Sequence, residues 1–384
     1  MADPIILLAG VPQSNMTLYH RIRFSVGDSA AWIGNFGGAG ESLLLVRDIE
    51  MERARQHARA DRVACAADFV PEGGLSGDRD TALAQATAEC LRRAGANVVV
   101  TDRTLPFLFA WQLQQAGMEV QYDADLGVLQ RRVKDGEEIV ALTKAQTVTM
   151  EAMQMACSWI ATASADAIGV LHQGGEVLTS ERVRRRITQF VLERGFSNSH
   201  DSIVATVPHV ADCHHFGTGP LVSGVPVIVD IFPRDDSTGY NGDCTRTVVH
   251  GTPTDTVKRM HAAVVAAKNA GCAALCAGTT GEAVHRATVA VIEEHGFAFK
   301  RGSSKVDDAI PAMRHGTGHG IGLDVHEPIL LDDGGGEILS GEVFTVEPGL
   351  YSATLGGVRV EEMAWVNGDS ASILGTLHEG LIWD

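Results

Sequence analysis

The stretch from His315 to Glu327 most constrains what this chain can fold into. It reads H-G-T-G-H-G-I-G-L-D-V-H-E, so three histidines lie close together and glycines alternate through its first half. Each glycine costs a helix about 1 kcal/mol relative to alanine, and glycine lets the backbone pass close to another group. The stretch is therefore predicted to be a loop that leads into a strand at residues 323–325. Its imidazole nitrogens are suited to binding a metal ion or carrying a proton.

Two other kinds of site fit this stretch poorly. A dinucleotide-binding loop has the pattern G-x-G-x-x-G and opens a helix, whereas the glycines here recur at every second position before strand-like residues. The helical zinc motif H-E-x-x-H fails because Pro328 directly follows Glu327 and position 330 is not a histidine. A metal ion at this loop would therefore need ligands from elsewhere in the chain.

The composition excludes several classes of partner and location. The 384 residues suffice for two or three domains, and the formal net charge of -17 repels nucleic acid and acidic membrane surfaces. No apolar run approaches the ~18 residues of a membrane-spanning helix, and the N-terminus lacks the basic residues of a signal peptide. The seven cysteines are scattered and form no disulfide framework. We therefore expect a cytoplasmic protein that acts on small substrates, with neither nucleic acid nor membrane as a partner.

The first part of the chain is predicted to be an α/β domain. Short apolar runs at residues 42–46, 62–66 and 97–100 read as strands, and they alternate with helical patterns at residues 49–60 and 80–94. Nothing in this region clusters catalytic groups. Its charged residues fall mostly on helix faces, which is typical of a solvated surface.

A second domain is predicted to begin at residue 134. Asp135 followed by Glu138 is a capping-box-like start for a long helix, and the boundary therefore separates residues 1–133 from residues 134–384. A further helical pattern ends before Gly195, and after it the chain becomes rich in strand-like runs. The candidate chemistry lies in this later part.

Two aspartates are expected to face each other across a hairpin. Residues 225–231 form an apolar run that carries Asp230 into buried surface, where a carboxylate needs a partner. Asp243 begins a second strand-like run, and turn residues lie between the two runs. Asp235 and Asp236 are rivals for the first acid, but they fall in the turn, where aspartate commonly forms local hydrogen bonds. The pattern favours Asp230.

A second pair of acids follows the same pattern. Residues 343–347 form a strand that ends at Glu347, turn residues follow, and a returning strand carries Glu361 and Glu362. Alternation puts Arg359 and Glu361 on one face of that strand and Glu362 on the other. Because an arginine can hydrogen-bond a carboxylate that binds a metal, Glu361 is favoured over Glu362 as a ligand.

Four semi-buried carboxylates at one place need compensation, since burying an unpaired charge is costly. Two divalent cations would supply it, and four carboxylates with one imidazole suit Mn²⁺ better than a thiolate-type structural zinc. The alternative is a network in which the acids pair with Arg246 and Arg359. Two arginines cannot neutralise four acids, and this alternative leaves the glycine-rich histidine loop unexplained.

Together these residues resemble the pita-bread metallopeptidase family, which includes prolidase, aminopeptidase P, creatinase and methionine aminopeptidase. The family signature H-G-x-[SG]-H-x-[LIV]-G-L-x-V-H-[DE] matches His315–Glu327 without a gap. Further matches are V-I-V-D at Asp230, D-x-T-R-T at Asp243, T-V-E-P-G-L-Y at Glu347 and G-V-R-V-E at Glu361. The resemblance covers the second domain well. Over the first domain it rests on the order of elements and on the junction near residues 132–139.

The resemblance implies an α+β protein in which a C-terminal pita-bread (creatinase/aminopeptidase) domain follows a smaller N-terminal α/β, creatinase-like domain. It also implies two divalent metal ions per chain, with Mn²⁺ ahead of Co²⁺ or Zn²⁺. By this resemblance Asp230 holds one ion, while Asp243 and Glu361 bridge both. His319 and Glu347 hold the other. Paired ions of this kind lower the pKa of water and stabilise a tetrahedral intermediate.

The remaining signature residues are expected to act on the substrate. By resemblance Glu347 also accepts the proton of the attacking water. His326 hydrogen-bonds the developing oxyanion or the scissile amide, and His315 lines the substrate pocket. Arg359 is a further candidate for contact with the substrate.

Another substrate-side histidine of the family matches within the stretch D-C-H-H-F-G. Counting back from Asp230 favours His214, although the doubled histidine leaves His215 open. Cys213 beside these histidines could also indicate zinc, but one cysteine and two adjacent histidines make a poor tetrahedral set. The spacing from Asp230 to Asp243 is two residues longer than is usual in the family, which predicts an extended turn near the site.

The function implied by the resemblance is hydrolysis of the bond before proline at the N-terminus of a short peptide. Prolidases act on dipeptides in this way, and aminopeptidases P act on longer peptides. An N-terminal domain counts against a methionine aminopeptidase, and five retained ligand positions count against a creatinase-like enzyme or a non-catalytic binding module. Relatives are commonly dimers, so a homodimer is expected. Proline preference rests on the resemblance, because no residue pattern here displays a pocket for the pyrrolidine ring.

Overall fold

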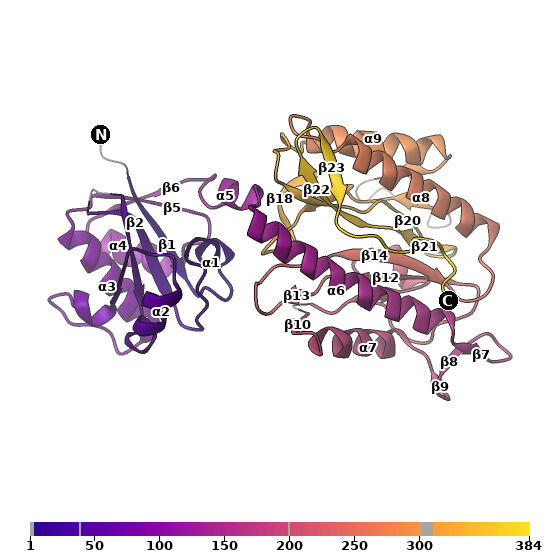
Figure 1. Cartoon of the computed structure of the whole chain (residues 1–384), viewed down its shortest axis with the longest axis horizontal. Helices are drawn as coiled ribbons and strands as arrows, with labels where there is room; N and C mark the ends of the chain where they lie inside the picture. The colour runs from indigo at the N-terminus through magenta and orange to yellow at the C-terminus, as the bar shows by residue number, and fades with distance from the viewer. Residues whose placement is uncertain (1–3, 38–39, 199, 301–309) are drawn as a thin grey trace. The chain divides into compact units, whose positions relative to one another are not determined.

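The computed structural model describes residues 4–37, 40–198, 200–300 and 310–384. Helices and strands are mixed throughout (Figure 1), which confirms the expected α+β class. The chain divides into two units, Met1–Arg131 and Arg132–Asp384, whereas the sequence led us to place the boundary after residue 133. Helix α5 (Val128–Arg132) runs across the observed division.

The N-terminal unit is built on one six-stranded sheet with the order β4-β3-β2-β1-β5-β6. Its strands are β1 (Ile5–Gly10), β2 (Ala30–Phe36), β3 (Glu41–Val46), β4 (Arg62–Cys65), β5 (Val98–Thr101) and β6 (Glu119–Tyr122). Its helices are α1 (Met16–Ile22), α2 (Met51–His57), α3 (Arg79–Arg93) and α4 (Phe107–Gln115). The three strands and two helices predicted for this region are present, with ends that differ by no more than three residues.

Both faces of this sheet are covered, because its strands alternate between two buried sets of side chains. Leu7 packs with residues of α3 and α4, including Leu91 and Phe109. Leu8, the next residue of β1, packs on the other face with residues of α1 such as Leu18. The unit is α/β, as the sequence predicted, and the alternation gives it three layers.

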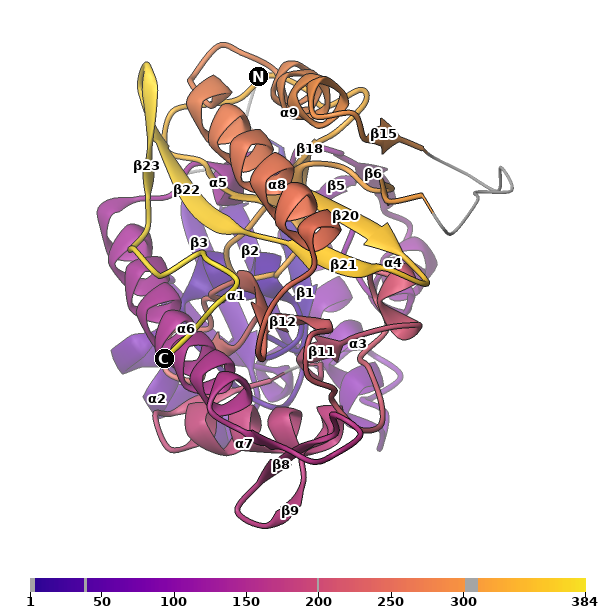
Figure 2. The same cartoon turned by 90° about the vertical axis from the view of Figure 1, so that its right-hand side faces the viewer.

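Four helices frame the C-terminal unit: α6 (Gly136–Ala161), α7 (Ser180–Leu192), α8 (Asp255–Ala274) and α9 (Gly281–Glu294). The α6 and α7 helices lie on one side of the strands, and α8 and α9 lie on the other (Figures 1 and 2). The predicted capping box at the start of α6 is present, with Asp135 and Glu138 each accepting from the other's backbone N–H. The sequence analysis missed α8 and α9, although Val257, Met260 and Val264 are buried at helical spacing.

The strands between these helices form three main sheets, with the orders β11-β12-β14, β15-β16-β20-β21 and β18-β17-β19-β22-β23. Strands of the first two sheets are β11 (Ile203–Ala205), β12 (Pro226–Ile231), β14 (Cys244–Val249), β15 (Ala298–Phe299), β16 (Ala312–Met313), β20 (Gly349–Ser352) and β21 (Gly356–Arg359). Those of the third are β17 (Gly318–Gly320), β18 (Glu327–Leu331), β19 (Val343–Val346), β22 (Glu362–Asn367) and β23 (Ser370–Ile373). Strand β21 lies against β12 and β14, so the first two sheets meet in the centre of the unit. Shorter pairings join β7 (Ser164–Ala165), β8 (Leu171–Gln173) and β9 (Glu176–Val177), and β10 (Phe196–Ser197) with β13 (Arg234–Asp235).

The first predicted hairpin is present, but the second is wrong. Strands β12 and β14 pair antiparallel, which places Asp230 opposite Thr245. Strand β19, in contrast, pairs with β22, while β20 forms a separate hairpin with β21 inside the region expected to be a turn. The chain therefore leaves one sheet for the next at Glu347 and returns at Glu361, so that each acid lies at a crossover between two sheets.

The strand predicted at residues 323–325 is also wrong. The backbone forms β17 before this point and β18 after it, and residues 321–326 are a turn. The Glu327 carboxylate accepts hydrogen bonds from the backbone N–H groups of Leu323 and Asp324, at 3.0 and 3.3 Å. These local bonds take the donors that a neighbouring strand would otherwise need.

Candidate metal centre

Acidic side chains from separate parts of the chain converge in the centre of the C-terminal unit. Carboxylate oxygens of Asp230, Asp243 and Glu361 lie within 4.8 Å of one another, and all three residues are buried. Asp230 belongs to β12, Asp243 directly precedes β14, and Glu361 lies between β21 and β22. The antiparallel pairing of β12 with β14, and the packing of β21 against both strands, bring these residues together.

His319 lies beside both Glu347 and Asp243. Nε2 of His319 is 3.5 Å from Oε1 of Glu347 and 3.9 Å from Oδ2 of Asp243. Strand β17 presents His319, and Glu347 N–H donates to the carbonyl of Thr317 in the same loop. The structure thus brings together the five residues that the sequence analysis selected as metal ligands.

The tautomer of His319 leaves a lone pair facing the carboxylates. Its Nδ1 lies 3.0 Å from the carbonyl oxygen of Gly320, which can only accept, so the proton of the neutral ring is on Nδ1. Burial lowers the pKa of His319 to about 3, with a smaller contribution from His326, so no second proton is held near neutral pH. When Glu347 and Asp243 are ionised, their oxygens and Nε2 are all acceptors, and they repel one another unless a cation lies among them.

The carboxyl groups are also held in surroundings that disfavour their joint ionisation. Burial raises the pKa of Asp243 well above its ordinary value, and the charges of Asp230 and Glu347 raise it further. Burial and the charge of Asp243 do the same to Glu361. The Glu347 side chain is 20% exposed, yet desolvation in the pocket still raises its pKa to about 7. Positive charge at this place would therefore be strongly stabilising.

One arginine lies within the cluster and cannot supply that charge alone. Arg359 Nη2 donates to Oδ2 of Asp230 at 2.6 Å, and its Nη1 donates to the Tyr351 hydroxyl at 3.0 Å. The other oxygen of Asp230, Oδ1, is buried and has no hydrogen-bond partner among the described residues. The single positive charge of this guanidinium is too small to balance four carboxylates. This donor set, with its unused oxygen and its imidazole lone pair, fits two divalent cations.

Arg246, the second arginine of the alternative network, pairs with Glu362 and not with the four selected acids. Its Nη2 donates to Oε1 of Glu362 at 2.6 Å, and Lys268 Nζ lies 3.9 Å from the same oxygen. Glu362 therefore points away from the acids and toward two cations, while its neighbour Glu361 points toward them. Arg246 also donates to the carbonyl oxygen of Glu361 at 2.6 Å, so it holds the backbone of that residue.

The other two histidines of the signature line a cavity of about 840 Å³ that opens onto the carboxylates. His315 lies in the wall, where Nδ1 is 2.7 Å from the Gly316 carbonyl and Nε2 is 2.6 Å from the Tyr351 hydroxyl. Both ring nitrogens are thus engaged. The His326 ring packs edge-on against that of His319 with centroids 4.2 Å apart, and burial lowers its pKa, so it is neutral as well.

The two adjacent histidines have different surroundings. His214 lines the cavity. The ring of His215 instead stacks on His209 with centroids 4.3 Å apart, and its Nδ1 accepts the N–H of Gly217 at 2.9 Å. Only His214 is therefore placed to meet a bound substrate.

The sequence analysis did not identify the residues that hydrogen-bond or pair with the signature stretch and with Asp243. Lys134 Nζ lies 2.9 Å from Glu327 Oε2, and both side chains are nearly fully buried. Asn241 donates from its backbone and its side chain to the carbonyl of Gly322, at 3.0 and 2.9 Å. Gln146 binds the peptide groups of Asp243. The sequence signal that could have identified such residues is a polar residue within the apolar face of a helix, such as Gln146 in the long helix α6.

None of the helices in the described part of the chain combines the length and apolar character that crossing a bilayer requires.

Comparison with known proteins shows which family the sequence of this chain matches. The model of metallopeptidase family M24 matches residues 140–368, which is more than half of the chain. The protein named "Probable dipeptidase PepE" of Mycobacterium tuberculosis is 29% identical over 347 residues, covering 90% of this chain and 83% of that protein. A "Putative Xaa-Pro aminopeptidase" of Mycoplasma genitalium is 31% identical over 243 residues, covering 62% of this chain and 60% of that protein.

Solved structures share the fold over almost the whole chain. The prolidase from Pyrococcus horikoshii OT3 superposes with a TM-score of 0.78 at 21% identity, covering 99% of this chain and 95% of that one. An Xaa-Pro dipeptidase from Bacillus anthracis gives a TM-score of 0.79 at 23% identity, covering 98% and 94%. At these identities the likeness is one of fold, and it confirms the expected pita-bread architecture.

Proposed function

The chain belongs to metallopeptidase family M24, and from that premise we propose that it hydrolyses the Xaa-Pro bond at the N-terminus of short peptides. The observation that carries the metal-dependent part of this proposal is the lone pair of His319 Nε2, which faces the Glu347 carboxylate at 3.5 Å. The choice of an Xaa-Pro bond is supported by relatives named Xaa-Pro aminopeptidase, Xaa-Pro dipeptidase and dipeptidase.

We propose that two divalent ions bind at this cluster, Mn²⁺ before Co²⁺ or Zn²⁺, because oxygen ligands predominate. Asp230 would hold one ion, Asp243 and Glu361 both, and His319 with Glu347 the other. When bound, such ions lower the pKa of water and stabilise negative charge on the substrate. Arg359 would orient the Asp230 carboxylate through the hydrogen bond at 2.6 Å.

Glu347 is the candidate general base. It lies at the wall of the cavity, and its side chain is 20% exposed, so water or substrate can reach the carboxylate. The proton that it takes from the attacking water would be delivered to the leaving amine. The same carboxylate has two successive tasks, and the partial exposure of its side chain leaves room for both.

The histidines of the cavity are candidates for holding the peptide. His326 is neutral, so it can donate one N–H to the scissile amide or to the oxyanion that develops from it. His315 is fixed by Tyr351 and would shape the pocket more than bind through hydrogen bonds. His214 and Arg359 complete the substrate-side set.

Location and assembly are further parts of this proposal. We infer a cytoplasmic protein, which is consistent with cysteines that are all free. We infer a homodimer on the ground that relatives in this family are commonly dimers. Neither nucleic acid nor membrane is an expected partner of a chain with a net charge of -17.

A panel of peptides tests the substrate class. An Xaa-Pro dipeptide, an Xaa-Pro-Yaa tripeptide and a Met-led peptide without proline are supplied with Mn²⁺, Co²⁺ or Zn²⁺ in turn, and release of the first residue is measured. Cleavage of the two proline peptides but not of the third supports the proposal. Preference for the Met-led peptide would replace it with a methionine aminopeptidase activity, and cleavage of none would favour a creatinase-like reaction or a binding module.

A further inference from the structure

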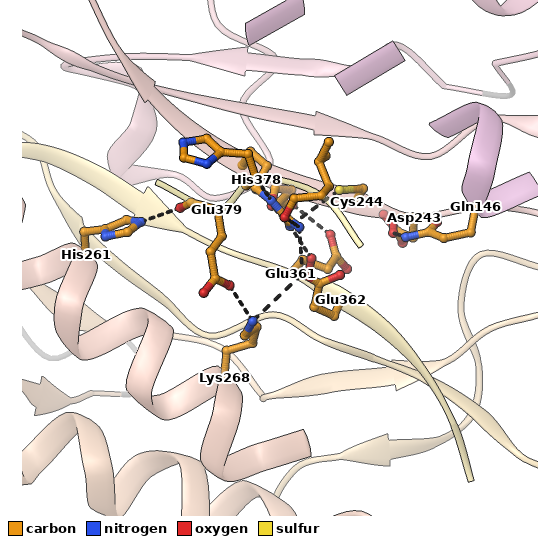
Figure 3. Close-up of polar contacts among 12 residues, drawn as sticks. Gln146, Asp243, Cys244, His261, Lys268, Glu361, Glu362, His378 and Glu379 are labelled. Atoms are coloured by element: carbon orange, nitrogen blue, oxygen red, sulfur yellow. Dashed lines mark hydrogen bonds and ion pairs between the residues drawn. The ribbon is translucent and has the colours of Figure 1, made fainter. Parts of the chain in front are cut away.

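Gln146 is the one side chain of α6 that binds both peptide groups of a proposed metal ligand. Its Nε2 donates to the Asp243 carbonyl oxygen at 2.8 Å, and its Oε1 accepts the Asp243 N–H at 2.9 Å. Figure 3 shows Gln146 reaching from the helix to Asp243 beside the group that contains Glu361 and Glu362. The side-chain amide of Gln146 thus forms the two hydrogen bonds with Asp243 that the backbone of a neighbouring strand would otherwise form.

The position of Asp243 explains why such a contact is needed. The last pair of the β12–β14 ladder joins Ile231 to Cys244, so Asp243 lies one residue beyond the ladder. A residue at this point gains no ladder hydrogen bonds from a neighbouring strand, although its peptide groups are buried. Gln146 forms hydrogen bonds with both the N–H and the carbonyl of Asp243. A buried glutamine amide without such a polar partner would be destabilising.

The chain is also brought unusually close to the helix at this place. A Cβ atom on Gly242 would lie 2.2 Å from Thr149 Oγ1 and 2.7 Å from the Ala145 carbonyl oxygen, so only glycine fits. The backbone before Asp243 therefore rests directly on α6. Gln146 is completely buried, and its amide is fixed by the helix on one side and by the peptide on the other.

We propose that Gln146 is a positioning residue that fixes the Asp243 peptide, and through it the carboxylate, at the distance from Asp230 and Glu361 that two metal ions require. This inference rests on the proposed function in taking Asp243 as a ligand. It adds a residue outside the ligand set on which metal affinity depends. Partners of this kind typically change metal affinity or activity by about 10–100-fold when they are removed.

The test compares three substitutions on the same helix. Gln146→Met keeps the length and volume of the side chain but removes both hydrogen bonds. Gln154→Met makes the same chemical change at an exposed position, where the amide contacts only Ser158. Met153→Ala removes buried volume from a residue that is completely buried in the core and serves as the control for lost stability alone.

Two readouts are measured that do not depend on turnover. The first is Mn²⁺ affinity by isothermal titration of the chelator-treated chain, and the second is hydrogen exchange of the Asp243 amide in the metal-free chain. We expect Gln146→Met to weaken Mn²⁺ binding about tenfold or more and to speed that exchange. Gln154→Met should match the wild type in both. Met153→Ala should lower the melting temperature while leaving Mn²⁺ affinity within about twofold.

Wild-type affinity in Gln146→Met would overturn the inference. So would an equal loss of affinity in Met153→Ala, since the effect would then follow from stability alone. A wild-type chain that binds Mn²⁺ but cleaves no Xaa-Pro peptide would overturn the proposed substrate. The inference about Gln146 would then be decided by the Mn²⁺ affinities of the variants alone. A wild-type chain that binds no divalent ion would overturn both.

Discussion

Nε2 of His319 lies 3.5 Å from Oε1 of Glu347, and the imidazole has no proton to place between them. The ring proton is on Nδ1, where it is donated to the carbonyl of Gly320 at 3.0 Å. A lone pair and an ionised carboxylate at this separation repel each other, so a cation that both groups bind stabilises the pair. In the metal-free chain a proton on Glu347, whose pKa is raised to about 7, relieves the same repulsion.

Replacing Glu347 with glutamine should lower kcat for an Xaa-Pro-Yaa tripeptide by about 10²- to 10⁴-fold, because the proton acceptor is lost. The measurement is made at saturating Mn²⁺, so that weaker metal binding does not limit the rate. Glu294→Gln is the control, since Glu294 is an exposed residue at the end of α9. Near-normal turnover by the Glu347 variant would remove its assigned role.

The doubled histidine offers a matched pair of substitutions. His214→Ala should lower kcat/KM roughly two- to tenfold, the net value of one lost hydrogen bond to the peptide. His215→Ala should leave kcat/KM unchanged and lower the melting temperature, because its ring stacks on His209. The opposite result would exchange the roles of the two residues.

Breaking the ion pair of Lys134 with Glu327 should strongly destabilise the chain. Both side chains are nearly fully buried, so Lys134→Met removes the cation that offsets the buried Glu327 charge and should cost about 3–5 kcal/mol in the free energy of unfolding. Changing Glu327 to glutamine in the same chain should recover part of that loss. Lys258→Met, which breaks an exposed pair with Asp255, should cost about 0.5 kcal/mol in the same urea titration. Equal losses for the two lysines would contradict the argument from burial.

The metal-free chain should lose stability as the pH rises from about 7 to 9. The pKa of Glu347 is raised in the folded chain to about 7, and those of Asp243 and Glu361 are raised as well. Above pH 7 the histidines whose pKa is lowered, such as His319, are largely neutral in both states, so the folded state binds more protons than the unfolded state and stability falls as those protons are released. Melting temperatures of the chelator-treated chain at pH 7 and pH 9 measure the effect. Added Mn²⁺ should reverse it, and a melting temperature that rises with pH in the metal-free chain would be inconsistent with these shifts.

Much of the site could be predicted because short local sequence patterns indicate which side chains it contains. Asp230 ends a buried strand, and the antiparallel pairing with β14 needs only the alternation of apolar runs and turn residues. The choice between Glu361 and Glu362 followed from the two-residue period of a strand, and the two side chains do point to opposite sides. The histidines were visible because glycines separate them in the sequence, although part of the predicted loop is strand β17, which carries His319.

What could not be predicted depends on contacts between distant segments. The hairpin expected between Glu347 and Glu361 is two crossovers between sheets, because β19 pairs with β22 and β20 pairs with β21. Local patterns do not distinguish these pairings. The role of Gln146 was hidden for the same reason, since its partner Asp243 is brought near only by the packing of α6 on β14. The extended turn before Asp243 was expected, but its anchor at Asn241 was not.

The most direct test is a titration of the chelator-treated chain with Mn²⁺ while hydrolysis of an Xaa-Pro-Yaa tripeptide and bound metal are followed together. The account predicts no turnover without metal and activity that reaches its maximum as two ions bind per chain. Full activity in the chain that binds no metal, or saturation of the metal site with no cleavage of the Xaa-Pro bond, would contradict it.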